Sequence, residues 1–144
     1  MRPSKIFIIT TLSLFTFFTS HAQCKRFTKK NCLPVLTPFI YNGQLTSALM
    51  APGESAEIVM TFTPGHDYRL LFCGQEVIGD VMFKIMDKNH KVIYERRKPE
   101  QKAYFDFNVT TTQQFIIEVY IPSKDTPSEI VPTGCVTLMV GYKS

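Results

Sequence analysis

The sequence has little of what catalysis usually requires. It contains no tryptophan, and beyond residue 22 its histidines are His66 and His90. No serine lies in a Gly-x-Ser-x-Gly elbow, because Gly53-Glu54-Ser55 lacks the second glycine and is typical of a turn. No two cysteines have the C-x-x-C spacing of a zinc site. We therefore expect no enzymatic activity, no cofactor and no metal.

A run long enough to span a membrane is also missing. The uncharged apolar segment Ile6–Phe18 is shorter than the roughly 18–20 residues that cross a bilayer. It follows the positively charged segment Met1–Lys5 and precedes Ser20-His21-Ala22, which has small residues where signal peptidase needs them for a cut after Ala22. Residues 1–22 are therefore predicted to be a signal peptide, and the protein to be secreted or periplasmic.

Cys24 leaves an alternative open, since a cysteine just beyond the cut can carry a lipid anchor. Lipoprotein processing requires a small residue before that cysteine, and this chain has Gln23 there. Release is therefore favoured over a lipid anchor at Cys24.

The charge of the chain gives little reason to expect a nucleic-acid partner. Removal of Arg2 and Lys5 with the signal lowers the net charge from +4 to +2, which is near neutral. Two basic clusters remain, and they could attract anionic glycans or a membrane surface. A solvated terminus and a solvated loop are the simpler explanation of both clusters, and we favour it. The clusters are Lys25/Arg26/Lys29/Lys30 and Arg96/Arg97/Lys98.

Four cysteines follow the predicted signal, and an even number in an exported domain indicates disulfides. Three connectivities are open. The expected one pairs Cys24 with Cys32 across a short local loop. It then pairs Cys73 with Cys135, which would tie a middle strand to the last one.

From residue 43 onward, short apolar runs alternate with turn residues, and no segment keeps a helical period, which indicates an all-β domain. Residues 23–42 precede it as a basic, turn-rich, cysteine-containing segment, and 43–144 are predicted to form one antiparallel two-sheet sandwich with about eight strands. The expected strands are Gln44–Met50, Ala56–Thr63, Tyr68–Cys73, Val81–Asp87, Lys91–Glu95, Ala103–Val109, Gln113–Ile121 and Cys135–Tyr142.

Alternation within these strands predicts which side chains face the core. Tyr68/Leu70/Phe72 share one face of their strand, and Val136/Leu138/Val140 share one face of theirs. Cys73 and Cys135 are out of phase with these sets. Both cysteines are therefore expected on the faces that point away from the core.

Four segments of the predicted strands share a spacing pattern: Gly65-x-x-Tyr68-x-Leu70, Val81-x-Phe83-x-Ile85-x-Asp87, Phe105-x-Phe107 with Thr112, and Ile117-x-Val119. This pattern resembles the bacterial pre-peptidase C-terminal domain and, more widely, jelly-roll sandwiches similar to galactose-binding domains. The resemblance implies an eight-stranded sandwich of jelly-roll type that serves as an accessory or binding module, and it transfers no catalytic residue.

Our leading hypothesis is a non-enzymatic module that binds a glycan or a protein at the cell envelope. Tyr104 and Tyr120 could stack on sugars, and Arg96, Arg97 and Lys98 could add charge. A structural component of an envelope protein complex is the alternative. A small hydrolase using strand-borne carboxylates such as Asp106 and Glu118 is the third hypothesis.

Non-reducing peptide mass mapping tests the cysteine prediction. We expect two disulfides in the mature protein, because all four cysteines follow the signal and the compartment is oxidising. A free thiol at Cys73 or Cys135 would contradict it.

Overall fold

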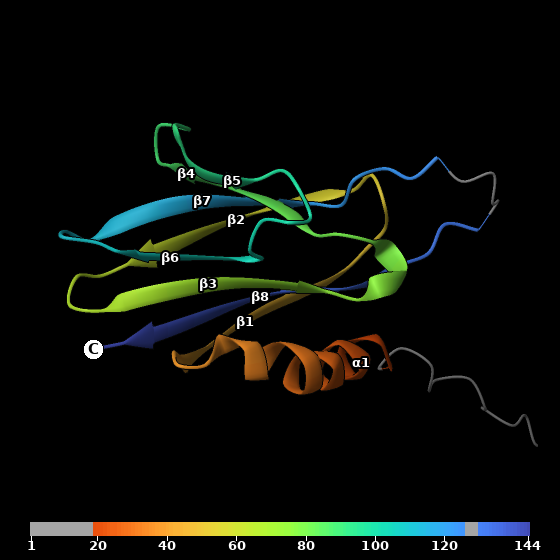
Figure 1. The fold of residues 1–144 in the computed structure, drawn as a ribbon, viewed down its shortest axis with the longest axis horizontal. Helices are drawn as coiled ribbons and strands as arrows, with labels where there is room; N and C mark the ends of the chain where they lie inside the picture. Colours follow the sequence, from red (N-terminus) through yellow and green to blue (C-terminus); the bar gives the residue numbers. More distant parts are fainter. Residues whose placement is uncertain (1–18, 126–129) are drawn as a thin grey trace, which may run out of the picture.

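The computed structural model describes residues 19–125 and 130–144, so most of the predicted signal peptide lies outside the described part. Within it, eight strands form two four-stranded antiparallel sheets packed face to face (Figure 1). The predicted all-β sandwich is confirmed. The strands are β1 (Ile40–Met50), β2 (Ser55–Phe62), β3 (Asp67–Gly74), β4 (Met82–Asp87), β5 (Val92–Arg96), β6 (Tyr104–Asn108), β7 (Gln113–Tyr120) and β8 (Gly134–Lys143).

The strand order is that of a jelly roll. Sheet A has the order β1-β8-β3-β6 and sheet B the order β2-β7-β4-β5, so most consecutive strands lie in opposite sheets. This wrapping of one sheet over the other is how two Greek keys close into a sandwich. Each expected strand is present, although β1 starts at Ile40, three residues before the expected domain boundary.

The core lies between the sheets and is built by the predicted alternation. Leu70, Phe83, Ile85, Ile117 and Val140 are completely buried there. Their neighbours in sequence point to the outer faces of the two sheets. The N-terminal segment covers the outer face of sheet A, and no described element covers that of sheet B (Figure 1).

The N-terminal segment differs from the expected turn-rich stretch, because it is helical. Helix α1 (Thr19–Phe27) continues into the π-turn η1 (Thr28–Cys32) and the 3-10 turn η2 (Leu33–Leu36). We call this stretch the helical cover, since Figure 1 shows it lying along the outer face of sheet A. None of the described helices is long and apolar enough to cross a membrane.

The helical cover fits β8 because their side-chain spacings match. Four residues of helix rise about 6 Å, and two residues of strand rise about 6.7 Å. Cys24 accordingly lies over Cys135, Thr28 over Thr137, and Leu36 over Gly141. At Gly141 an added Cβ would lie 2.9 Å from Leu36 Cδ1, so glycine is what lets the cover approach.

A second, smaller apolar cluster seals the cover onto the sheet. It consists of buried side chains from η1, η2, the following turn and the outer faces of β3 and β8. They are Cys32, Leu36, Phe39, Leu71 and Met139.

The expected disulfide connectivity is wrong. The structure joins Cys24 to Cys135 and Cys32 to Cys73, with Cα–Cα distances of 5.4 and 5.9 Å. Cys73 and Cys135 do lie on the non-core face of neighbouring strands, as predicted. That face is covered, and each cysteine therefore meets a cysteine of the helical cover above it.

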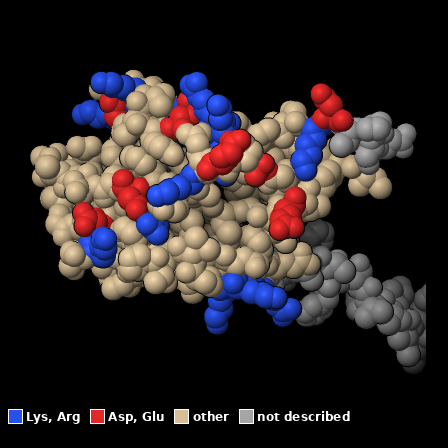
Figure 2. All heavy atoms as spheres, viewed as in Figure 1, with Lys and Arg blue, Asp and Glu red and all other residues tan. Residues whose placement is uncertain are grey.

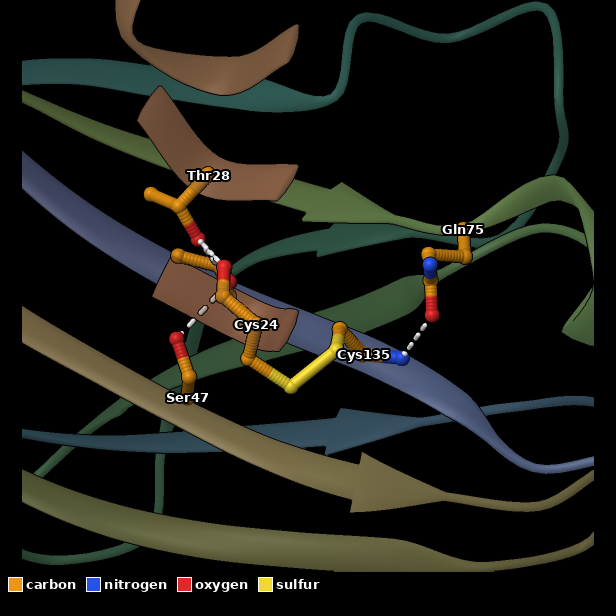
Figure 3. Close-up of a disulfide and its surroundings, with 6 residues drawn as sticks. Cys24, Thr28, Ser47, Gln75 and Cys135 are labelled. Carbon is orange, nitrogen blue, oxygen red and sulfur yellow. Dashed lines mark hydrogen bonds between the residues drawn. A yellow bond between two sulfur atoms is a disulfide. The ribbon is translucent and has the colours of Figure 1, made fainter. Parts of the chain in front are cut away.

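Polar groups at this interface are paired (Figure 3). Thr28 Oγ1 donates to the Cys24 carbonyl oxygen at 2.8 Å and lies 2.8 Å from Thr137 Oγ1. Ser47 Oγ of β1 lies 2.9 Å from the same Thr137 oxygen. On the other side of Cys135, the Gln75 side-chain oxygen accepts its backbone N–H at 2.7 Å. These contacts compensate for the removal of the hydroxyls from water.

Removing the longer disulfide should destabilise the fold without preventing it. We expect Cys24→Ala/Cys135→Ala to lower the free energy of unfolding by about 2–5 kcal/mol, because the bond closes a long loop of the unfolded chain. Urea denaturation measures this. Cys32→Ala/Cys73→Ala should lose slightly less, since its sequence separation is 41 rather than 111. A Cys24–Cys32 cross-linked peptide in wild-type digests would contradict the pairing.

Candidate interaction surfaces

The two tyrosines singled out from the sequence do not form a common site. Tyr104 projects from the outer face of β6 in sheet A, and Tyr120 from the outer face of β7 in sheet B. Both point away from the core as predicted, but to opposite sides of the sandwich. No single sugar can stack on both.

One face of the Tyr104 ring is already covered by the guanidinium group of Arg69. The guanidinium carbon of Arg69 lies 4.0 Å from the Tyr104 ring centre and 4.4 Å from that of Phe39. Arg69 also binds Asp106 through two hydrogen bonds of 2.7 and 2.8 Å, and this bond raises the pKa of Arg69. The Tyr104 ring therefore closes the edge of the helical cover instead of offering a free face.

Arg96 is a loop-organising residue and not a surface cation. It shares the inward phase of Tyr94 and is only 6% exposed. Its guanidinium donates to the Val81 carbonyl oxygen and, at 2.9 Å each, to those of Pro99 and Gln101. These three bonds hold the loop between β5 and β6 in place.

Arg97 and Lys98 are exposed, as the sequence suggested. A 2.7 Å ion pair joins Arg97 to Glu95, and the hydrogen bond of this pair raises the pKa of Arg97. The electrostatic influence of Tyr120 acts in the same direction. Of the two predicted tyrosines, Tyr120 is therefore the one that acts electrostatically on Arg97, on the sheet B side.

The carboxylates named for a hydrolase also lie apart. Asp106 is on the outer face of sheet A, and Glu118 is on the outer face of sheet B, where it lies 3.6 Å from Lys84 Nζ. A glycosidase needs its two acids on either side of one sugar, about 5–10 Å apart. This pair is separated by the core and cannot work on one bond.

Two clefts open between loops at opposite ends of the sandwich. A polar cleft of about 570 Å³ is lined by Thr61, Asp87, Lys88, Asn89, Thr111, Thr112, Gln113 and Gln114. A smaller one of about 380 Å³ is lined by Phe72, Cys73, Gly74, Glu76, Gly79, Asp80, Val81, Arg96 and Ala103. Neither contains Tyr104 or Tyr120, so neither joins an aromatic platform to the predicted cations.

The outer face of sheet B carries an apolar row across all four strands. The register aligns Val59 of β2 with Ile116 of β7, Met86 of β4 and Val92 of β5, and Ile93 follows at the edge. Val59 at one end of the row and Val92 and Ile93 at the other are 52%, 48% and 42% exposed, whereas Ile116 and Met86 between them are buried. Among the described residues no element covers this row, whereas a solvated sheet face is normally polar.

A charged row runs beside the apolar row. Glu57, Glu118, Lys84 and Glu95 are aligned across the four strands. Lys84 pairs with Glu118 and Arg97 with Glu95. Apolar side chains with a charged border are the arrangement of a protein–protein contact surface. Sequence alternation places these residues outward, but only the register reveals the rows.

Comparison with known proteins adds a fold likeness and no family. No family model matches the chain, and no curated protein matches it. The chain is similar in fold to the solved structure of Aeromonas hydrophila PliG, a periplasmic lysozyme inhibitor of g-type lysozyme. The TM-score is 0.48 at 8% sequence identity, over 69% of this chain and 85% of that one. A likeness at this level carries no argument about function, and the resemblance to the pre-peptidase C-terminal domain stays a prediction.

The different roles of two adjacent arginines can be measured. Arg96→Gln should lower the free energy of unfolding by about 2–4 kcal/mol, because buried carbonyl oxygens lose a charged donor. Arg97→Gln should leave it almost unchanged, because its ion pair is exposed. Urea denaturation of both variants decides this, and equal effects would refute the structural role of Arg96.

Proposed function

We propose that the protein is an exported, non-enzymatic module that binds another protein through the outer face of sheet B. The observation that carries this proposal is the contrast between the two sheets. The outer face of sheet A is closed by a helix held with two disulfides. No described element covers the outer face of sheet B, and its apolar row keeps Val59 exposed at one end and Val92 and Ile93 exposed at the other.

The disulfides support export. Bonds of this kind persist in oxidising compartments and are rare in the cytosol. They also favour release over lipid tethering, because the Cys24 sulfur is bonded to Cys135 and is not free to carry a lipid.

The chemistry of the face defines the partner. Burying Val59, Val92 and Ile93 against a matching apolar patch is favourable in proportion to the area removed from water. The border holds three carboxylates, and within the described part of the chain Glu57 forms no salt bridge. The partner we propose therefore presents an apolar patch bordered by basic side chains.

A protein fits these features better than a glycan does. Sugar binding would rest on exposed aromatic rings, and the structure places Tyr104 under Arg69 on the other sheet. Only Tyr120 stays on the outer face of sheet B, and it is partly buried beside Met82 in the register.

A charge placed in the apolar row tests the proposal. Val59→Lys should weaken binding at least about tenfold, because a cation would be buried against the partner. The matched control is Val77→Lys, since Val77 is 53% exposed but lies in the turn η3 away from this face. The partner is first captured with tagged wild-type protein from the exported fraction, and its Kd is then measured with each purified variant.

The outcomes separate the alternatives. Loss of binding with Val59→Lys and retention with Val77→Lys supports the proposed face, and equal binding by both refutes it. A partner that stays bound in fixed stoichiometry through purification would make the protein an assembly component of an envelope complex. Exchange of the partner would make it a reversible binding module.

A further inference from the structure

The helical cover presents a second surface, which is strongly basic. The sequence contains no Asp or Glu before Glu54. The buried stripe Cys24/Thr28/Cys32 of the cover faces the sheet, and the residues between these positions face solvent except Phe27, which is partly buried. All four of the cations there are exposed: Lys25, Arg26, Lys29 and Lys30.

These cations are close together and unneutralised. They span six residues of helix, and the five steps between the first and the last rise about 7.5 Å along its axis. Within the described residues none of them is in a salt bridge. Figure 2 shows Lys and Arg side chains gathered over the helical cover with no acidic side chain among them, whereas the two signs are mixed on the opposite side.

This arrangement works against the helix itself. Lys25/Lys29 and Arg26/Lys30 are like-charge pairs four residues apart, which destabilise a helix. After cleavage at Ala22 the helix would begin at Gln23, so Lys25 and Arg26 would lie in its first turn, where the helix dipole does not favour cations. Helix stability therefore does not explain this cluster, and functional surfaces are where such local rules are expected to be broken.

The cover is also held rigidly. Cys24 and Cys32 are bonded to two different strands of sheet A, so both ends of the cationic stretch are fixed. A surface that is ordered before binding loses little conformational entropy when a ligand binds.

Exposed apolar side chains flank the cations. Leu45 and Leu49 of β1 pair with Met139 and Cys135, so they project on the same face as the cover. They are 39% and 49% exposed, and Val35 of η2 is 52% exposed. A soluble acidic polymer offers no apolar surface against which these side chains could be buried. A bilayer offers anionic headgroups to the cations and hydrocarbon to the leucines.

We propose that the helical cover, with Leu45 and Leu49 beside it, is a docking surface for a membrane rich in anionic lipid. The attachment is peripheral, because the apolar stripe of the helix is already buried against sheet A. Its strength depends on salt, since exposed charges are screened within about 8 Å at physiological ionic strength. This surface is on the side of the molecule opposite the proposed protein-binding face (Figure 1).

Co-sedimentation with vesicles tests the proposal. The exported protein, with its signal removed, is mixed with vesicles of phosphatidylcholine alone or with about one third phosphatidylglycerol. We expect binding only to the anionic vesicles and its loss in about 0.5 M salt. The test variant is Lys25→Gln/Arg26→Gln/Lys29→Gln/Lys30→Gln, which should bind about a hundredfold more weakly. The control removes four exposed cations away from the cover: Lys88→Gln/Lys91→Gln/Lys98→Gln/Lys124→Gln.

Three outcomes overturn the proposal. Equal binding to both vesicle types removes the role of anionic headgroups. Equal weakening in the test and control variants would show that net charge matters and the cover does not. If Leu45→Ser/Leu49→Ser binds anionic vesicles as well as wild type and dextran sulfate displaces the protein, the ligand is an acidic polymer. Peptide mapping of both disulfides verifies that each variant is folded.

Discussion

Closure of the outer face of sheet A by the helical cover is the constraint on which the other features depend. Strand β8 is buried on both faces. On the outer face of sheet A, Met139 of β8 and Leu71 of β3 form one apolar cluster with the cover. Left open, this face would expose Met139 and Leu71 to water. The helical cover removes them from solvent, its cysteines fix it there, and Gly141 lets Leu36 and Phe39 approach. The hydrophobic contact is primary, and the two disulfides make it permanent.

Because one face is closed in this way, the molecule has two unlike sides. The cover carries cations without acids, and sheet B carries an apolar row with a mixed charged border. The two proposed surfaces point in opposite directions. A molecule lying on an anionic membrane through its cover would therefore hold the outer face of sheet B toward the surrounding medium, where a protein partner can reach it. The sandwich would act as a spacer of fixed orientation.

Much of the sandwich can be predicted from the sequence because alternation reports burial directly. Leu70, Phe83 and Ile117 face the core as their phase predicts, and Cys73 and Cys135 face away from it. Alternation is local, however, and does not say which sheet a strand joins. For that reason Tyr104 and Tyr120 are correctly placed outward but cannot be recognised as lying on opposite sides.

The helical cover could have been recognised from two signals. Cys24, Thr28, Cys32 and Leu36 recur every four residues, and β8 has apolar residues on both faces. Pro34 conceals the first signal, since it suggests a turn, yet it lies at the start of η2 where proline is tolerated. The role of Arg96 can be predicted only in part from the sequence. Its phase with Tyr94 predicts an inward side chain, but the three carbonyls that accept its hydrogen bonds exist only once the loop has folded.

The bond from Cys24 to Cys135 also determines what a single cut by a peptidase does to the protein. It joins positions 111 residues apart, so almost every loop of the sandwich lies inside one covalent ring. A peptidase that cuts any one of these loops releases no fragment, because both pieces stay connected through sulfur. Such a nick opens a ring and does not divide a chain. A single cut in one of these loops would separate the two pieces of a sandwich without this disulfide once it unfolds, but it does not separate them here.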